Sequence, residues 1–125
     1  MSILGNFYRI TSAEQTAPNK MVAHIRLNAG HPIFRGHFPG NPVTPGVCML
    51  QIVKDIAEII FEKKLELVSA SNVKFMAIIN PEINPDIRLE LTCTEENHRV
   101  KVSQIATFGD TVALKLNATY KILFQ

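Results

Sequence analysis

The chain has 125 residues, of which 46% are hydrophobic and 19% charged, which suits one globular domain covering residues 1–125. Its formal net charge of +2, without a run of Lys or Arg, argues against a nucleic-acid partner. No apolar run is long enough to span a bilayer and the opening residues lack a signal-peptide pattern, so we expect a cytoplasmic protein with no membrane partner.

Two strands are predicted in the first quarter of the chain, at residues 5–15 and 21–28. In the second of them, apolar and polar side chains partly alternate. Residues 16–19 contain Pro and Asn, which are common in turns, and are expected to join the two strands. Residues 30–46 then hold four glycines and four prolines, a density that predicts neither a helix nor a regular strand.

A helix is predicted from Val47 to about Lys64, a stretch without Gly or Pro. Nearly all of its side chains are apolar, so the helix must be largely enclosed, and a curved sheet wrapped around it would enclose it. Besides Lys54, four polar side chains spaced by four, three and four residues form one stripe, which we interpret as a solvated face: Gln51, Asp55, Glu58 and Glu62.

The remainder of the chain predicts strands at residues 65–79, 87–95, 98–108 and 111–124, with breaks at 80–86 and 109–110. In the second of these strands, every other side chain from Ile87 to Cys93 is apolar, as in a half-buried strand. Two strands, one buried helix and about four more strands make an α+β domain with a mainly antiparallel sheet.

Residues 34–51 read FRGHFPGNPVTPGVCMLQ. This segment resembles the active-site signature of the β-hydroxyacyl-ACP dehydratases, and residues 71–75, SNVKF, are similar to the family's next strand. The resemblance implies the hot-dog fold, a long central helix wrapped by a curved antiparallel sheet of about five to six strands. It also implies a homodimer or higher homo-oligomer in which two sheets join edge to edge.

The same resemblance implies a lyase of fatty-acid or related acyl-chain biosynthesis. Its reaction would interconvert 3-hydroxyacyl and trans-2-enoyl thioesters carried on acyl carrier protein, without a cofactor or metal. Dehydration removes a proton from C2 and hydroxide from C3, and an imidazole suits the base because it titrates close to working pH. The resemblance assigns this role to His37, and the role of oxyanion donor to the N–H of Gly46 at the helix start. It also implies substrate-binding residues around an apolar tunnel at the dimer interface: Phe38, Pro39, Gly40, Val43, Val47 and Phe75.

Gln51 departs from the family pattern, in which this position carries an acidic residue that comes from the opposite subunit and assists departure of the hydroxyl. An amide can hold a hydroxyl or a water but cannot donate a proton as an acid does. Three explanations remain open. Gln51 could position the substrate while water carries the proton, Asp55 could substitute as the acid, or the chain could be a catalytically weak acyl-thioester-binding or partner subunit.

Simpler interpretations stand beside these roles. Outside such a motif His37 would be a loop histidine that caps a turn, and Gln51 could merely begin the polar stripe. Cys48 is interpreted as a core thiol, and both cysteines as reduced thiols of a cytoplasmic protein. The four scattered histidines do not have the spacing of a metal site. The hot-dog fold also hosts thioesterases, so a thioesterase is a further alternative.

Overall fold

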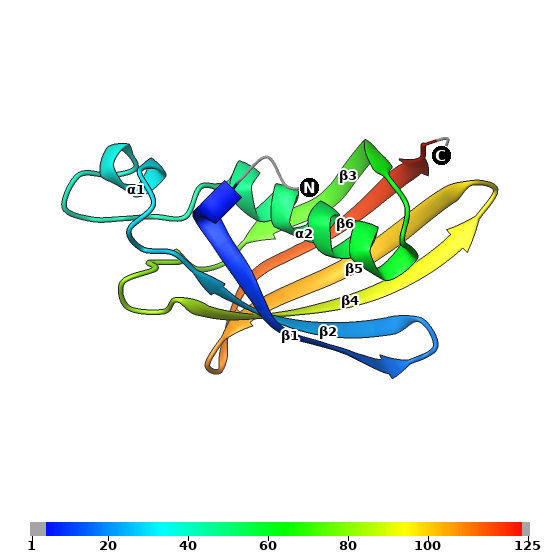
Figure 1. Cartoon of the computed structure of the whole chain (residues 1–125), viewed down its shortest axis with the longest axis horizontal. Helices are drawn as coiled ribbons and strands as arrows, with labels where there is room; N and C mark the ends of the chain where they lie inside the picture. Colours follow the sequence, from blue (N-terminus) through cyan, green and yellow to red (C-terminus); the bar gives the residue numbers. More distant parts are fainter. Residues whose placement is uncertain (1–4, 124–125) are drawn as a thin grey trace.

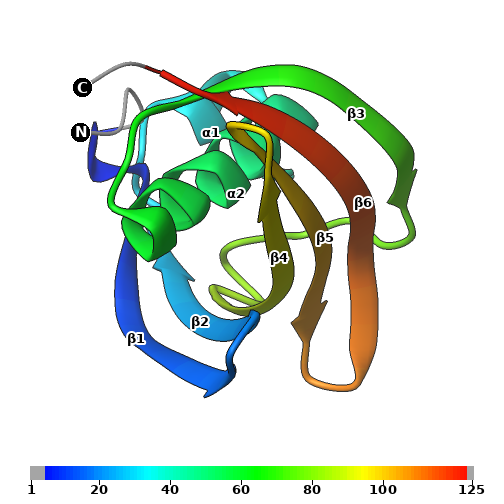
Figure 2. The same ribbon diagram turned by 90° about the vertical axis from the view of Figure 1, so that its right-hand side faces the viewer.

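An antiparallel sheet of six strands curves around a long helix, α2, which lies in the concave face of the sheet (Figures 1 and 2). The computed structural model describes residues 5–123. The strand order across the sheet is β1-β2-β4-β5-β6-β3, with every neighbouring pair antiparallel. The elements in chain order are the 3-10 turn η1 (Gly5–Phe7), β1 (Tyr8–Ala17), β2 (Lys20–Leu27), α1 (Ile33–Gly36), α2 (Gly46–Phe61), β3 (Leu65–Phe75), β4 (Asp86–Glu96), β5 (Arg99–Phe108) and β6 (Thr111–Ile122).

The core lies between α2 and the concave face of the sheet. Met49, Ile52, Val53 and Ile56 of α2 are each at most 2% exposed, and they belong to one cluster with the buried side chains of the strands. The expectation that the helix is enclosed is therefore confirmed, and so is the expected α+β hot-dog class. None of the helices within residues 5–123 has the length and apolar character needed to cross a membrane.

The predicted alternation in β4 is also confirmed, because Ile87, Leu89, Leu91 and Cys93 are all buried. β4 and β5 are joined by a two-residue turn at Asn97 and His98, and both residues have positive φ (53° and 61°). Two positive φ values are the mark of a type I′ turn, whose twist matches that of the flanking strands.

Several predicted boundaries are wrong. The first strand begins only at Tyr8, after η1, and the predicted turn at 16–19 shrinks to Pro18 and Asn19 because β1 continues to Ala17. Residues 30–46 do contain a helix, the single turn α1. β3 ends at Phe75 rather than residue 79, and residue 124 of the last predicted strand lies outside the described residues.

The long helix ends at Phe61, three residues before the predicted end. Glu62 adopts a left-handed conformation (φ 52°) and its N–H turns back to the carbonyl oxygens of Glu58 and Ile59. The helix is therefore closed by a left-handed cap without the glycine that usually marks one. The sequence carries no Gly or Pro here that could have indicated this end.

β1 and β3 are the two edges of the sheet in the isolated chain. β3 is exposed along its whole length except at Leu65, and its exposed side chains include Leu67 and Val68, both 45% exposed, and Val73. A long edge strand with apolar side chains is a surface on which another strand can pair.

Candidate active site

The glycine- and proline-rich segment lies at one end of the molecule, where α1 and the loop after it meet the N-terminal end of α2 (Figure 1). The loop that follows β3 reaches the same end, and Thr44 N–H bonds to the carbonyl oxygen of Ile79 in that loop at 2.9 Å. The start of α2 is thus fixed between two loops that are far apart in the sequence.

His37 is held by residue 43 through two hydrogen bonds. The N–H of Val43 donates to the backbone oxygen of His37 at 2.8 Å, and the ring Nδ1 of His37 lies 2.9 Å from the carbonyl oxygen of Val43. A carbonyl oxygen can only accept, so Nδ1 carries the proton and the lone pair of the neutral ring is on Nε2. Residue 43 precedes the helix start by three residues, which limits the separation of these two backbone positions to about 11 Å.

Residues 38–41 form a tight loop next to the histidine. The N–H and C=O groups of Phe38 and Asn41 bond to each other in both directions, at 3.2 and 2.9 Å, and Gly40 has the positive φ (72°) that such a loop requires. The peptide between His37 and Phe38 is cis, and their rings stack with centroids 4.2 Å apart. The imidazole is held by its hydrogen bond to Val43 and by its stacking on the Phe38 ring.

The start of α2 presents unpaired backbone donors. Pro45 precedes the helix in an extended conformation, and its carbonyl oxygen accepts from the N–H groups of Cys48 and Met49. The N–H groups of Gly46 and Val47 have no protein acceptor among residues 5–123. The first N–H groups of a helix, together with the positive end of its dipole, favour a developing negative charge.

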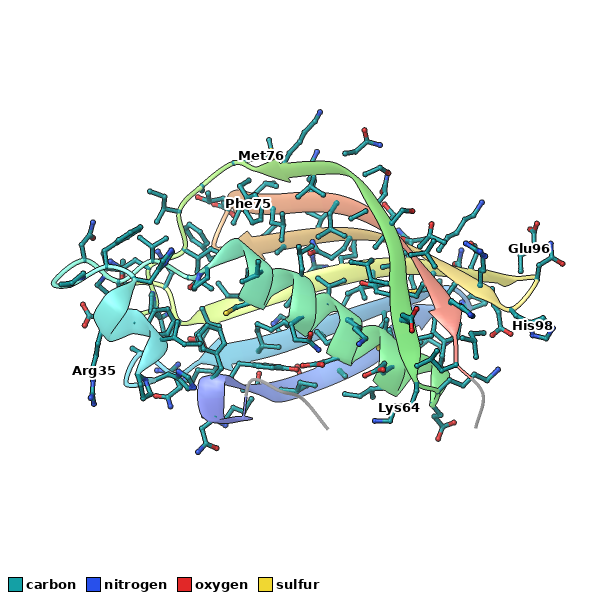
Figure 3. All side chains as sticks on the ribbon, turned by 90° about the horizontal axis from the view of Figure 1, so that it is seen from above. Arg35, Lys64, Phe75, Met76, Glu96 and His98 are labelled. Carbon is teal, nitrogen blue, oxygen red and sulfur yellow. The ribbon has the colours of Figure 1, made fainter. Side chains whose placement is uncertain are left out.

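Phe75 covers Gly46. A Cβ added at Gly46 would come within 2.7 Å of Cζ of the Phe75 ring, so only glycine leaves room for this contact. Figure 3 shows Phe75 at the end of β3, beside the first turn of α2. The candidate oxyanion donor and a candidate lining residue are therefore in direct contact.

Apolar side chains surround this end of the molecule. Val47 is 73% exposed, Phe75 55% and Phe38 50%. Pro39 and Gly40 are exposed in the tight loop, while Val43 is half-buried. An exposed apolar patch of this kind is typical of a ligand site or an interface.

The side chain of Gln51 is hydrogen-bonded to a buried carboxylate and is not part of a solvated face. Its side-chain NH₂ donates to Oδ1 of Asp55 at 2.9 Å, and the hydroxyl of Tyr8 on β1 donates to Oδ2 of the same carboxylate at 2.8 Å. Asp55 is only 7% exposed, so the interpretation of this residue as solvated is wrong. The cause is the start of β1, which brings Tyr8 over this face of α2.

The predicted site residues thus fall into three contact groups. His37, Phe38 and Val43 form one, Gly46 and Phe75 a second, and Gln51 with Asp55 a third. Within the described part of the chain no hydrogen bond joins Gln51 to His37. Tyr8 was missed by sequence reasoning, since nothing local relates it to a residue 47 positions away.

His31, His98 and the two cysteines lie in positions that suit structural roles. His31 accepts from the N–H of Ile33 through its ring Nδ1 and packs against Phe7, and His98 lies in the β4–β5 turn at the far end of the molecule (Figure 3). Cys48 and Cys93 are buried free thiols, and burial raises the pKa of both, that of Cys93 to about 11. A buried thiol with a raised pKa is a poor nucleophile, in agreement with the core role expected for Cys48.

The chain is similar in sequence to known dehydratases. Residues 13–116 match the model of the ApeI-like family, described as ApeI dehydratase. The 3-hydroxyacyl-[acyl-carrier-protein] dehydratase FabZ of a Caulobacter species is 30% identical over 118 residues, covering 86% of this chain and 71% of the relative. The corresponding FabZ of Rickettsia bellii is 30% identical over 101 residues, 77% of this chain and 70% of the relative.

Among solved structures, the chain is similar to one described as the dehydratase heterocomplex ApeI:P from Xenorhabdus doucetiae. The TM-score is 0.74 at 24% sequence identity, with 93% of this chain and 97% of the other covered. This likeness supports the fold, and the family match and the sequence relatives extend through the candidate site. The chain belongs to the ApeI-like family of hot-dog dehydratases.

Proposed function

We propose that the protein interconverts 3-hydroxyacyl and trans-2-enoyl thioesters carried on acyl carrier protein, with His37 as the base. The single observation that carries this proposal is the bond between Nδ1 of His37 and the Val43 carbonyl oxygen. It leaves the Nε2 lone pair for the C2 proton. The segment that carries this ring leads into a helix start whose unpaired N–H groups can receive the charge on the thioester oxygen.

In the proposed dehydration, His37 Nε2 takes the C2 proton, the C2–C3 double bond forms and the C3–O bond breaks. The Gly46 N–H stabilises the enolate-like oxygen of the transition state. Gln51 supplies hydrogen bonds but no proton, so the departing hydroxide recovers the proton from the His37 ring, directly or through a water. The products are the enoyl thioester and water, and the enzyme returns to its starting state.

Asp55 is a weak candidate for the missing acid. Both of its oxygens are already engaged, one by the Tyr8 hydroxyl and the other by the Gln51 amide, so neither is free to reach the substrate hydroxyl. Among the three explanations for Gln51, we therefore favour the one in which the amide positions the substrate.

We also propose that two copies of the chain pair through β3. The apolar, exposed edge strand supports this, as do Val47, Phe75 and Phe38 at the rim of the site, which an isolated chain leaves half exposed or more. Pairing would enclose the acyl chain against Phe38, Pro39, Gly40, Val43, Val47 and Phe75. We further place the protein in the cytoplasm, since its two cysteines are free thiols.

The test is the hydration of a short enoyl thioester, followed as loss of the conjugated absorbance together with free-thiol release. We expect hydration by the wild type, its loss in His37→Ala, and no thiol release. Thiol release without hydration would refute the proposal in favour of a thioesterase.

A second candidate function is that of a partner subunit with little turnover of its own, which the amide at position 51 favours. The structural neighbour from Xenorhabdus doucetiae is described as a dehydratase heterocomplex, ApeI:P. In this case the purified chain would bind acyl-thioester analogues but would not hydrate the enoyl thioester, and activity would appear only when a second dehydratase subunit is added.

A further inference from the structure

Asp55 is a buried carboxylate whose two hydrogen-bond donors are both neutral. Tyr8 and Gln51 each occupy one oxygen, and none of the ion pairs within residues 5–123 involves Asp55. Burial, and then the hydrogen bond and charge of Asp55, raise the pKa of the Tyr8 hydroxyl far above its ordinary value, so this hydroxyl stays protonated and remains a donor.

These contacts determine which end of the Gln51 amide faces Asp55. A carboxylate can only accept, so the NH₂ group must point to Asp55 and the amide oxygen must point away from it. If Asp55 were absent, the amide could turn over at little energetic cost, since its two ends have almost the same shape. The carboxylate therefore decides whether Gln51 offers an acceptor or a donor on its other side.

We propose that Asp55 and Tyr8 are positioning residues that make Gln51 present its amide oxygen to the 3-hydroxyl of the substrate. This inference rests on the proposed function of the site. Held in this way, the substrate hydroxyl donates its hydrogen to Gln51 and keeps its own lone pairs free. The proton that it needs in order to leave as water can then come only from another group, which is the role given above to the His37 ring.

The decisive variant is Asp55→Asn, because it should reverse the Gln51 amide while keeping the shape of the side chain. Asp55 is the one acceptor of the Tyr8 hydroxyl within residues 5–123, so Tyr8 would still donate to the oxygen at position 55 and the new NH₂ group would face Gln51. Gln51 would then turn its oxygen inward and offer its NH₂ group to the substrate. The site would change from an acceptor to a donor.

Two unreactive ligands report on this change: 3-hydroxyacyl and 3-oxoacyl pantetheine analogues with an amide in place of the thioester. The 3-hydroxyl can donate, whereas the 3-oxo group can only accept. We expect the wild type to bind the 3-hydroxy ligand about tenfold more tightly than the 3-oxo ligand. In Asp55→Asn the preference should shrink by about tenfold or reverse.

Glu58→Gln is the matched control, since it also changes a carboxylate of α2 to an amide. Glu58 accepts from the N–H of Leu65 at 2.8 Å, and an amide oxygen can replace it. This variant should keep the wild-type ligand preference. In a Gln51→Ala background, Asp55→Asn should no longer alter the preference, because the group that it acts through is gone.

A folded Asp55→Asn variant with the wild-type ligand preference would overturn the inference. If this variant does not fold, Tyr8→Phe takes its place: we expect hydration to fall about three- to tenfold, and full activity would overturn the inference. A wild type that neither hydrates the enoyl thioester nor binds either ligand would instead refute the proposed function itself.

Discussion

Gly46→Ala should separate stability from catalysis at this site. The added methyl would come within 2.7 Å of Cζ and 3.2 Å of Cε1 of Phe75, so the ring must move. Phe75 is 55% exposed, and the ring can swing outward. The partial burial that it would lose is less than half the value of a fully buried Phe, about 1 kcal/mol.

The same substitution has a compensating effect on the unfolded chain. Replacing Gly by Ala where φ allows it stabilises a protein by about 0.4–1 kcal/mol, and Gly46 does not have a positive φ. The two effects nearly cancel, so we expect the free energy of unfolding to stay within about 1 kcal/mol of wild type. Urea unfolding measures this directly.

Catalysis should respond much more strongly. The methyl would stand beside the N–H that receives the thioester oxygen, and losing one oxyanion donor typically lowers kcat by about 10²–10³-fold. The enoyl-thioester hydration assay reports the change. Phe75→Leu alone should keep most of the activity, and the double variant Gly46→Ala/Phe75→Leu should remain impaired.

Two results would refute this reasoning. If Gly46→Ala were folded and within about threefold of wild-type activity, the Gly46 N–H would not be the oxyanion donor. If the double variant regained activity, the defect would lie in the displaced Phe75 ring and not in the approach to the backbone.

Three further outcomes are expected. Gln51→Glu should raise hydration about tenfold or more, because in this direction the new carboxylate takes a proton from the attacking water, and the gain should shrink at low pH, where the carboxyl beside Asp55 is protonated; a stable variant that gains nothing would count against a dehydratase-like geometry. Dimers reassembled from equal amounts of His37→Ala and Gln51→Ala chains should recover about a quarter of the wild-type activity if each site takes these two residues from different subunits, because half of the dimers are mixed and each of those has one intact site. If each site lies within one subunit, the mixture should stay inactive. Burial raises the pKa of the Cys93 thiol from 9.0 to about 11, so the stabilisation from this shift is present below pH 9 and is lost as pH rises through 11. The free energy of unfolding should therefore fall by about 2 kcal/mol over this range. Urea unfolding of Cys93→Ala should not show this fall, and the same pH dependence of stability in both proteins would contradict the prediction.

The fold was largely predictable because its signals are long and periodic. The alternation from Ile87 to Cys93 and the apolar helix after Pro45 each repeat over many residues, and both are confirmed. The ends of elements were less predictable. Glu62 closes the helix in a left-handed conformation that is usually left to Gly or Asn, so no residue type marked the position.

The local contacts of the candidate site lie within the motif that the sequence singled out. His37 and Val43 are six residues apart in that motif, although they were assigned separate roles from the sequence and the hydrogen bond between them was not predicted. The surroundings of Asp55 were not predictable, because its polar partner on β1 is 47 residues away and the helix pattern alone suggested a solvated face. A buried carboxylate held by neutral donors has the same sequence signature as an exposed one.

The bond between the His37 ring and Val43 also bears on whether the loop must move during a turnover. Nδ1 is the donor in that bond whether the ring is neutral or cationic, so taking up a proton on Nε2 breaks no contact with residue 43. The two charge states of the imidazole can therefore share one geometry. Nε2 can then receive and release the substrate proton in each turnover without any rearrangement of the loop that carries the ring.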